Sequence, residues 1–205
     1  ARGPQDLTPL QLACVGSKSI RLMEVILSCP KVDISIKRNG KTIFNECCSS
    51  NSNPSRIAQL FLRHPNFESV IWNDDNTNMM WDRGIFRVED LWKILLQDGR
   101  IDPSRPNDRS EYLIHSPLND QKLQLLLDDE RVDPNIVSST KKSIWDSVTS
   151  STLGTLLLHE RVYCPPDDVF KRVVAKIFAR RGNVELMAEC CRFSGMGPDE
   201  LFGFL

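Results

Sequence analysis

A hydrophobic pattern recurs along most of the chain at intervals of 30 to 35 residues. In each copy, the apolar end of a helix is followed five positions later by another apolar residue, and in the first four copies an acid comes next. The later apolar residues are Val32, Phe67, Ile101, Val132 and Val162, so the successive steps are 35, 34, 31 and 30 residues. The last copy has Tyr163 in place of the acid. A period in this range is typical of solenoids of short helical units, so we predict an all-α repeat fold.

Each repeat is predicted to hold two helices, of which the second has the clearer pattern. Apolar residues recur at helical spacing over residues 20–29, 55–63, 88–97, 122–128 and 153–158. An apolar position of the first helix falls at Leu10, Phe44, Trp81, Leu113 and Trp145, in steps of 34, 37, 32 and 32 residues. We expect the shorter fourth and fifth repeats to have lost residues from the loop between their helices.

These landmarks define five repeats, and a sixth with a different pattern follows them, within a single domain of residues 1–205. Their predicted ranges are about 6–40, 41–75, 76–108, 109–140, 141–165 and 166–205. In the last of them, helices are predicted over residues 169–180, 182–192 and 198–204. Terminal repeats of a solenoid are commonly atypical because one face meets water, so we interpret the sixth repeat as a modified cap. The alternative is that a longer array continues beyond it.

The helical spacing also predicts which side chains face inward. On the second helix of the first repeat these are Leu22, Val25, Ile26 and Leu27. Trp81 and Trp145 occupy core positions of first helices, whereas Trp92 is expected to be partly exposed.

The first repeat begins with Thr8-Pro9-Leu10-Gln11-Leu12-Ala13 and ends with Val32-Asp33 and a polar turn through Asn39-Gly40. This arrangement resembles an ankyrin repeat, whose motif is Thr-Pro-Leu-His followed by two antiparallel helices and a projecting finger. Gln11 stands where the family has His. The resemblance implies an ankyrin-like solenoid of five to six units, in which the fingers and first helices form a concave surface that binds other proteins.

The same resemblance implies candidate partner-binding residues at the finger positions. They are Lys37, Arg38, Asn39 and Lys41 in the first finger; Trp72, Asn73, Asp74 and Asp75 in the second; Arg105, Asn107, Asp108 and Arg109 in the third; and Ser139, Lys141 and Lys142 in the fourth. Trp72 is the strongest single candidate, since tryptophan is over-represented among residues that dominate binding energy. The alternative is that Trp72 only packs, with Val70 and Ile71, against a neighbouring finger.

The overall charge does not favour a polyanionic partner. The chain has 26 Lys and Arg against 27 Asp and Glu, for a formal net charge of -1. We therefore expect no binding to nucleic acid, and a nucleic-acid-associated array is the less favoured alternative. No apolar run reaches the roughly 18 residues of a membrane-spanning helix, so no membrane partner is expected. Because a repeat begins almost at once, we expect a fragment or a processed product of a longer protein.

Seven cysteines are present: Cys14, Cys29, Cys47, Cys48, Cys164, Cys190 and Cys191. Their number is odd and no Cys-x-x-Cys pair occurs, which argues against a zinc site or a disulfide framework. We expect free thiols that pack as small apolar side chains, with redox or metal chemistry as the alternative. Reduced cysteines are typical of an intracellular protein, so we expect a cytoplasmic location and leave a nuclear one open.

The chain has none of the common phosphate-loop, dinucleotide, metalloprotease or hydrolase motifs. The three histidines fall in different repeats; His64 and His159 are expected to be exposed at helix ends, and His115 lies next to the core face. We expect no catalytic residue, metal or cofactor. The predicted function is a monomeric protein–protein interaction module, an adaptor or targeting domain of a larger intracellular protein. The alternative is the substrate-recognition part of an enzyme whose catalytic domain lies outside this chain.

Overall fold

The structure is a computed structural model that describes residues 7–17, 19–38, 40–71, 79–81, 85, 87–178 and 184–202 of the 205-residue chain. The chain divides into two compact units, Ala1–Asp108 and Arg109–Leu205, at the predicted boundary between the third and fourth repeats. The described residues are mainly helical and contain one sheet of two short strands. The all-α prediction is confirmed at this level.

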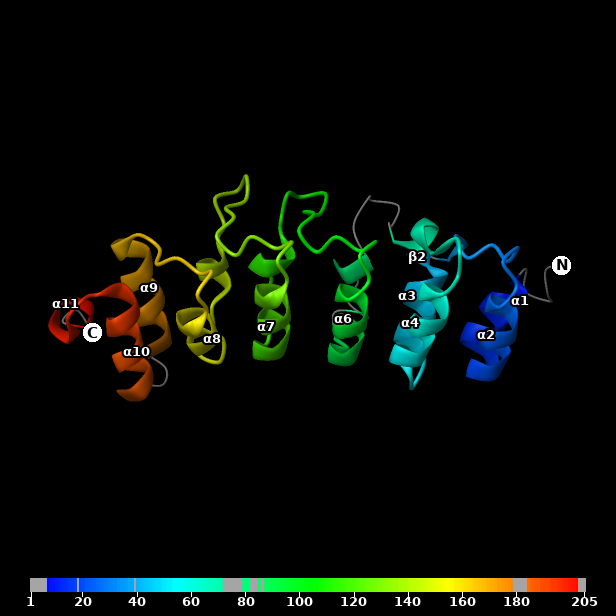
Figure 1. The fold of residues 1–205 in the computed structure, drawn as a ribbon, viewed down its shortest axis with the longest axis horizontal. Coiled ribbons are helices and arrows are strands. Elements are labelled where there is room, and N and C mark those ends of the chain that lie inside the picture. The colour runs from blue at the N-terminus through cyan, green and yellow to red at the C-terminus, as the bar shows by residue number, and fades with distance from the viewer. Residues whose placement is uncertain are drawn as a thin grey trace. The chain divides into compact units, whose positions relative to one another are not determined.

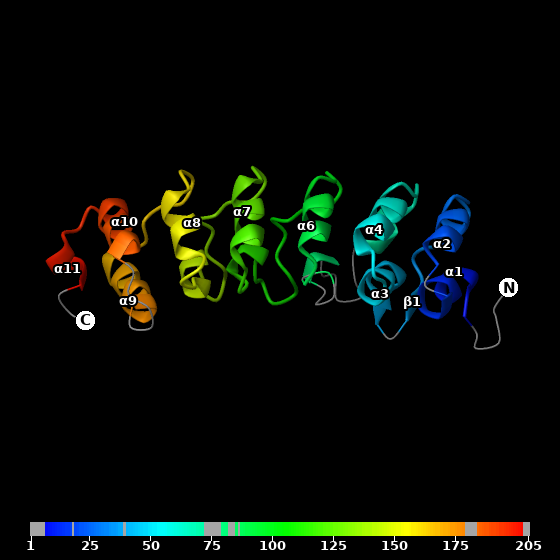
Figure 2. The same ribbon diagram turned by 90° about the horizontal axis from the view of Figure 1, so that it is seen from below.

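The N-terminal unit pairs first and second helices in successive repeats (Figure 1). Its elements are α1 (Pro9–Gln11), the π-helical turn η1 (Leu12–Ser17), α2 (Ile20–Leu27), β1 (Lys37–Arg38), β2 (Lys41–Thr42), α3 (Ile43–Ser50), α4 (Pro54–Leu62), the 3-10 turns η2 (Phe67–Val70) and η3 (Met79–Trp81), and α6 (Glu89–Leu96). Helix α4 packs against α2 on one side and α6 on the other, and α3 packs against η1. First and second helices therefore form two layers in this unit (Figure 2).

The first helix starts at a capping box. The Thr8 hydroxyl accepts a hydrogen bond from the main-chain N–H of Gln11, and the Gln11 side chain accepts one of 2.9 Å from the N–H of Thr8. Pro9 follows at the first helical position, where the missing N–H costs nothing. Gln11 therefore makes the reciprocal bond that closes the box.

Three phenylalanines form the core of the second repeat. The ring of Phe44 on α3 lies 5.3 Å from that of Phe61 on α4 and 5.8 Å from that of Phe67 on η2, both edge to face. All three side chains are fully buried. Edge-to-face pairs add about 0.5–1.5 kcal/mol beyond their burial, so the residues that repeat in the sequence meet in one cluster.

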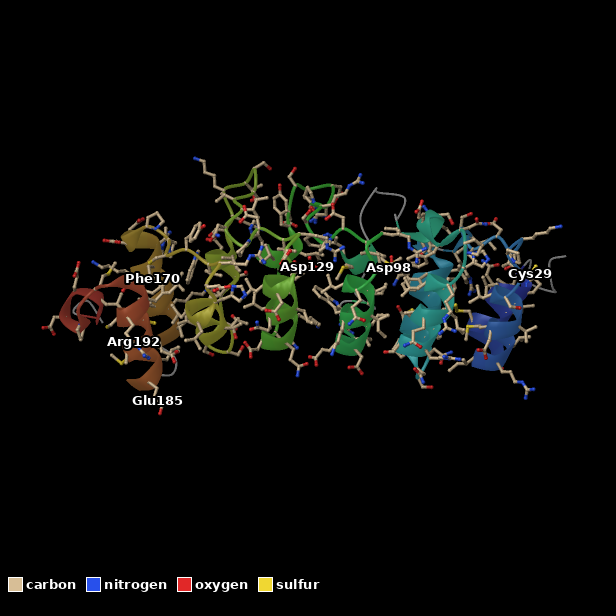
Figure 3. All side chains as sticks on the ribbon, in the orientation of Figure 1. Cys29, Asp98, Asp129, Phe170, Glu185 and Arg192 are labelled. Carbon is tan, nitrogen blue, oxygen red and sulfur yellow. A yellow bond between two sulfur atoms is a disulfide. The ribbon has the colours of Figure 1, made fainter. Side chains whose placement is uncertain are left out.

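The C-terminal unit has the same two layers (Figure 2). Its elements are η4 (Leu113–His115), α7 (Asp120–Asp128), η5 (Ile144–Ser147), α8 (Leu153–Leu158), α9 (Asp167–Phe178), α10 (Val184–Ser194) and α11 (Pro198–Phe202). Helix α8 packs against α7 and α10, while η5 packs against η4 and α9. The rings of Trp145, Phe170 and Phe193 join η5, α9 and α10, with centroids 5.8 to 5.9 Å apart (Phe170 is labelled in Figure 3).

Second helices begin and end within two residues of their predicted bounds, and α8 matches the prediction at both ends. The predicted buried face of α2 is confirmed at Leu27, which is buried, and wrong at Leu22 and Val25, which are 43% and 63% exposed. Met23, which was not predicted to face inward, is fully buried. Met23 and Leu27 are four residues apart and share one stripe of the helix, and that stripe faces the neighbouring helices. Trp92, expected to be partly exposed, is fully buried.

The first helices of the fourth and fifth repeats are short, contrary to expectation. Helix α3 has eight residues, but η4 and η5 are single 3-10 turns of three and four. In the fourth repeat Ser116 adopts an extended conformation and Pro117 follows, which is the conformation that a residue before proline prefers. The fourth and fifth repeats have thus lost residues from the first helix itself, and the predicted deletion in the loop is wrong.

Side chains that follow the second helices bind carbonyl oxygens of the preceding repeat. The bonds run from His64 Nε2 to Cys29 O (3.3 Å), from Arg100 Nη2 to Leu62 O (2.7 Å) and from Arg161 Nη1 to Leu127 O (2.7 Å). The carbonyls at a helix C-terminus lack partners within the helix, and these bonds satisfy some of them (Cys29 is labelled in Figure 3). His64 is 1% exposed, so the prediction that it is exposed is wrong.

The aspartates that follow three of the apolar landmarks have a local role. Asp33, Asp102 and Asp133 each accept a hydrogen bond of 2.9 Å from the main-chain N–H two residues later. Such bonds stabilise a tight turn. The repeating acid therefore fixes the bend at which the chain leaves the second helix for the next finger.

Cys14 and Cys47 form a disulfide between η1 and α3, and both are fully buried. The expectation of seven free thiols is therefore wrong for this pair. The odd number of cysteines and the absence of a Cys-x-x-Cys pair gave no indication of it. The two residues are 33 positions apart, which is one repeat, so neighbouring first helices bring equivalent residues together.

Candidate functional site

The first finger is a β-hairpin formed by β1 and β2, in which Lys37 pairs with Thr42 and Arg38 with Lys41. Gly40 has a φ of 75°, which glycine adopts without steric cost. The Arg38 guanidinium donates a hydrogen bond of 3.1 Å to Glu46 on α3. The predicted Asn39-Gly40 turn is confirmed at Gly40, and Asn39 lies outside the described residues.

Two later fingers, residues 102–112 and 133–143, repeat this backbone feature. Ser110 and Lys141 have φ values of 58° and 61°, which non-glycine residues adopt uncommonly, and both precede the next first helix by the same number of residues as Gly40 does. In the fourth finger the Ser138 hydroxyl accepts a hydrogen bond of 3.0 Å from the N–H of Lys142, and the Ser138 carbonyl accepts one of 2.9 Å from the N–H of Lys141. These bonds hold the tip in a tight turn.

Within the C-terminal unit, an ion pair joins the end of the finger 102–112 to the next finger. Lys142 Nζ lies 2.8 Å from Glu111 Oε1, 31 positions earlier. Lys142 therefore has an internal partner, as Arg38 has in the first finger.

The predicted binding residues differ in exposure. Lys41, Asp108, Arg109, Ser139, Lys141 and Lys142 are exposed, whereas Lys37, Arg38, Arg105 and Asn107 are half-buried. Trp72, Asn73, Asp74 and Asp75 lie outside the described residues, so the second finger stays a prediction. Within the C-terminal unit, the fourth finger brings Lys141 and Lys142 to the same tip.

A cavity of about 300 Å³ opens beside the fourth finger. Its walls come from Val137 and Lys141 on the finger, Trp145 on η5, and the segment from Tyr163 to Val169 that leads into α9. Trp145 is almost fully buried, whereas Val137 and Tyr163 are 59% and 71% exposed. The cavity therefore has an apolar floor and an apolar rim that water reaches.

The Asn135 side chain holds two of these walls together. Its Nδ2 donates a hydrogen bond of 2.7 Å to the carbonyl of Arg161, and its Oδ1 accepts one of 2.8 Å from the N–H of Tyr163. Both bonds join the fourth finger to the extended segment after α8. The position of Tyr163 relative to the finger is thus fixed by main-chain bonds.

Two titratable groups near the fourth finger have shifted pKa values. Burial lowers the pKa of His115. A hydrogen bond of 2.9 Å to the carbonyl of Ile136 opposes this shift. Burial raises the pKa of the Cys164 thiol on the cavity wall, and the negative charge of Asp167 adds to the shift. Both groups are therefore favoured in their neutral forms.

The sequence did not single out Val137, Tyr163 or the two prolines after Cys164 as site residues. One signal was available, because Tyr163 stands where the other repeats have an acid. A tyrosine cannot make the carboxylate turn described above, and here its main chain is held instead by Asn135. The cavity itself depends on packing between repeats, which the spacing of residues does not give.

Among the described residues, no cluster of three or more His, Cys, Asp or Glu is placed to hold a metal ion. In the same part of the chain, every helix is too short or too polar to cross a bilayer. Comparison of the chain with protein-family models, with curated proteins and with solved structures finds no match.

Proposed function

We propose that the chain is a divergent ankyrin-like repeat array that recognises another protein through its fingers. The helix pairs in two layers support this assignment, as do the hydrogen bonds and the disulfide that link one repeat to the next. The fingers with left-handed residues before α3, η4 and η5 fit the same architecture.

One observation carries the functional part of the proposal: the fingers are ordered by specific bonds but expose polar side chains. Lys41 and Lys141 extend to solvent from turns held by main-chain bonds and by Ser138. Polar loops that a rigid scaffold positions are common recognition surfaces. We infer a binding module of a larger protein rather than an enzyme.

The proposal is tested by capturing partners with the whole chain and comparing a finger variant with a matched control. The finger variant combines Asp108→Lys with Lys141→Glu, which leaves the net charge unchanged. The control combines Asp90→Lys with Arg21→Glu, both exposed on second helices. Partners enriched by the wild-type chain should be lost with the finger variant and kept with the control.

Equal enrichment by both variants would show that the partners bind elsewhere. If the wild-type chain enriches no protein above an inert bait, the function as a protein-binding module is overturned. Circular dichroism of each variant checks that a lost partner reflects the surface and not unfolding.

A further inference from the structure

The cavity beside the fourth finger combines an apolar rim with a rigid frame. Val137 and Tyr163 are among the few large apolar side chains of the described residues that stay exposed. Exposed apolar groups that converge on a concave site mark binding surfaces. Tyrosine is also enriched among the residues that dominate binding energy.

The frame is in place before any ligand arrives. Asn135 joins the finger to the main chain of Arg161 and of Tyr163 through one hydrogen bond each, and Ser138 fixes the turn that carries Lys141. Pro165 and Pro166 restrict the backbone of the opposite wall. Little conformational freedom would be lost on binding, which favours affinity.

The cavity lining, all of it within the described residues, contains a single charged side chain, that of Lys141. Lys141 is exposed, and it lies on the finger side of the cavity. On the opposite side the carboxylate of Asp167 is close enough to Cys164 to raise the pKa of the thiol. An anionic group of a ligand is therefore attracted to the finger side and repelled from the helix side.

We propose that this cavity binds an extended segment of another protein in which an apolar side chain neighbours an aspartate or glutamate. The apolar side chain enters between Tyr163, Trp145 and Val137, and the carboxylate pairs with Lys141. A protein segment is favoured over a small molecule because the exposed rim residues offer contact area beyond the cavity. The inference rests on the proposed function and names one site and one kind of partner for it.

A random-peptide display library selected on the whole chain tests this directly. Peptides that bind should pair an apolar residue with Asp or Glu, and fluorescence polarisation should show at least a tenfold weaker Kd for Tyr163→Ala and for Lys141→Glu. Both side chains are exposed, so the fold should be kept. Lys31→Glu makes the same charge change at an exposed site in the other unit and should bind as the wild type does.

A second selection on Lys141→Glu sharpens the test. It should enrich Lys or Arg beside the apolar residue, because the charge at the cavity is reversed. Selected peptides without an acid, or peptides that bind both cavity variants as tightly as the wild type, would overturn the inference. If such peptides are instead lost with Asp108→Lys, the finger function stands while the cavity site fails.

Phenylacetate serves as a small-molecule probe with the same two chemical groups. Binding of phenylacetate without any selected peptide would overturn the protein-segment proposal and leave a small-molecule site. Failure of the wild-type chain to capture any protein, with no peptide selected, would remove the proposed function and this inference together.

Discussion

The guanidinium of Arg161 donates a hydrogen bond of 2.7 Å to the carbonyl oxygen of Leu127, 34 positions earlier in the chain. The same group also binds the carbonyls of Asp129 and Val132. One side chain thereby satisfies several carbonyls at and after the end of α7 that have no helical partner. Arg100 occupies the same place in the N-terminal unit, one residue before its apolar landmark, and binds the Leu62 carbonyl, so this bond recurs between repeats.

Replacing Arg161 by alanine should lower the free energy of unfolding by about 1.5–3 kcal/mol, the range for hydrogen bonds to charged groups. Arg161→Lys should recover only part of this loss, because an ammonium group cannot reproduce the planar fork of donors. Urea denaturation followed by circular dichroism measures both changes.

Arg172 provides the control, because it is exposed and lies 3.9 Å from Asp168. The variant Arg172→Ala should change the free energy of unfolding by less than about 0.5 kcal/mol. An equal effect of the two alanine variants would contradict the role of Arg161.

The Cys14–Cys47 disulfide gives a second expectation. Reduction, or the double substitution Cys14→Ala with Cys47→Ala, should destabilise the N-terminal unit by about 2–4 kcal/mol, as is usual for a native disulfide. Non-reducing peptide mapping should recover the two residues in one linked fragment. Cys48 is buried next to Cys47 and takes no part in the disulfide, so Cys48→Ala serves as a control that removes a buried thiol and leaves the disulfide in place. If reducing agent leaves the wild-type stability unchanged and no linked fragment is found, the bond is absent in solution.

The second helices were predictable because their stabilising contacts repeat in the sequence. The landmarks Phe67, Ile101, Val132 and Val162 are buried and Val32 is half-buried. Packing therefore requires an apolar residue at the same point of each repeat, which produces the period in the sequence. The first helices were not predictable, because a single turn such as η4 has too few residues to show a helical period. Its end is set locally by Pro117, and its place is set by packing against η5.

The candidate site was predictable only in part. The resemblance to ankyrin repeats indicated the fingers, and Lys141 is indeed exposed at a finger tip. The apolar rim was missed because Val137 and Tyr163 look like ordinary loop residues until neighbouring repeats are packed together. Likewise, nothing in the spacing of Cys14 and Cys47 distinguishes a bonded pair from two small core residues.

His115 should make stability depend on pH. Burial lowers its pKa below the ordinary value of 6.5, while Lys142 lowers it further and Asp146 and Glu111 oppose the shift. Between the lowered pKa and 6.5 the unfolded chain binds a proton that the folded chain does not. This contribution to stability is therefore complete above pH 6.5 and decreases as the pH falls below it.

The variant His115→Gln isolates this contribution, because glutamine can donate to the Ile136 carbonyl but does not titrate. Urea midpoints measured on either side of the ordinary histidine pKa of about 6.5 should fall more steeply toward acid in the wild type than in the variant. Parallel pH profiles for the two proteins would show that His115 is not protonated differently in the folded and unfolded chains.

The contribution of Asn135 to the cavity wall can be tested bond by bond, because substitutions can remove both of its side-chain hydrogen bonds or only one. Asn135→Ala removes both and should cost about 1–3 kcal/mol, at about 0.5–1.5 kcal/mol per bond. Asn135→Asp keeps an acceptor for the N–H of Tyr163 but loses the donor to the Arg161 carbonyl. Amide hydrogen exchange at Tyr163 should therefore speed up in the alanine variant and stay slow in the aspartate variant.

Gln121, an exposed amide on α7, gives the control Gln121→Ala, which should leave both exchange and stability unchanged. Unaltered exchange at Tyr163 in Asn135→Ala would mean that another group holds this wall of the cavity.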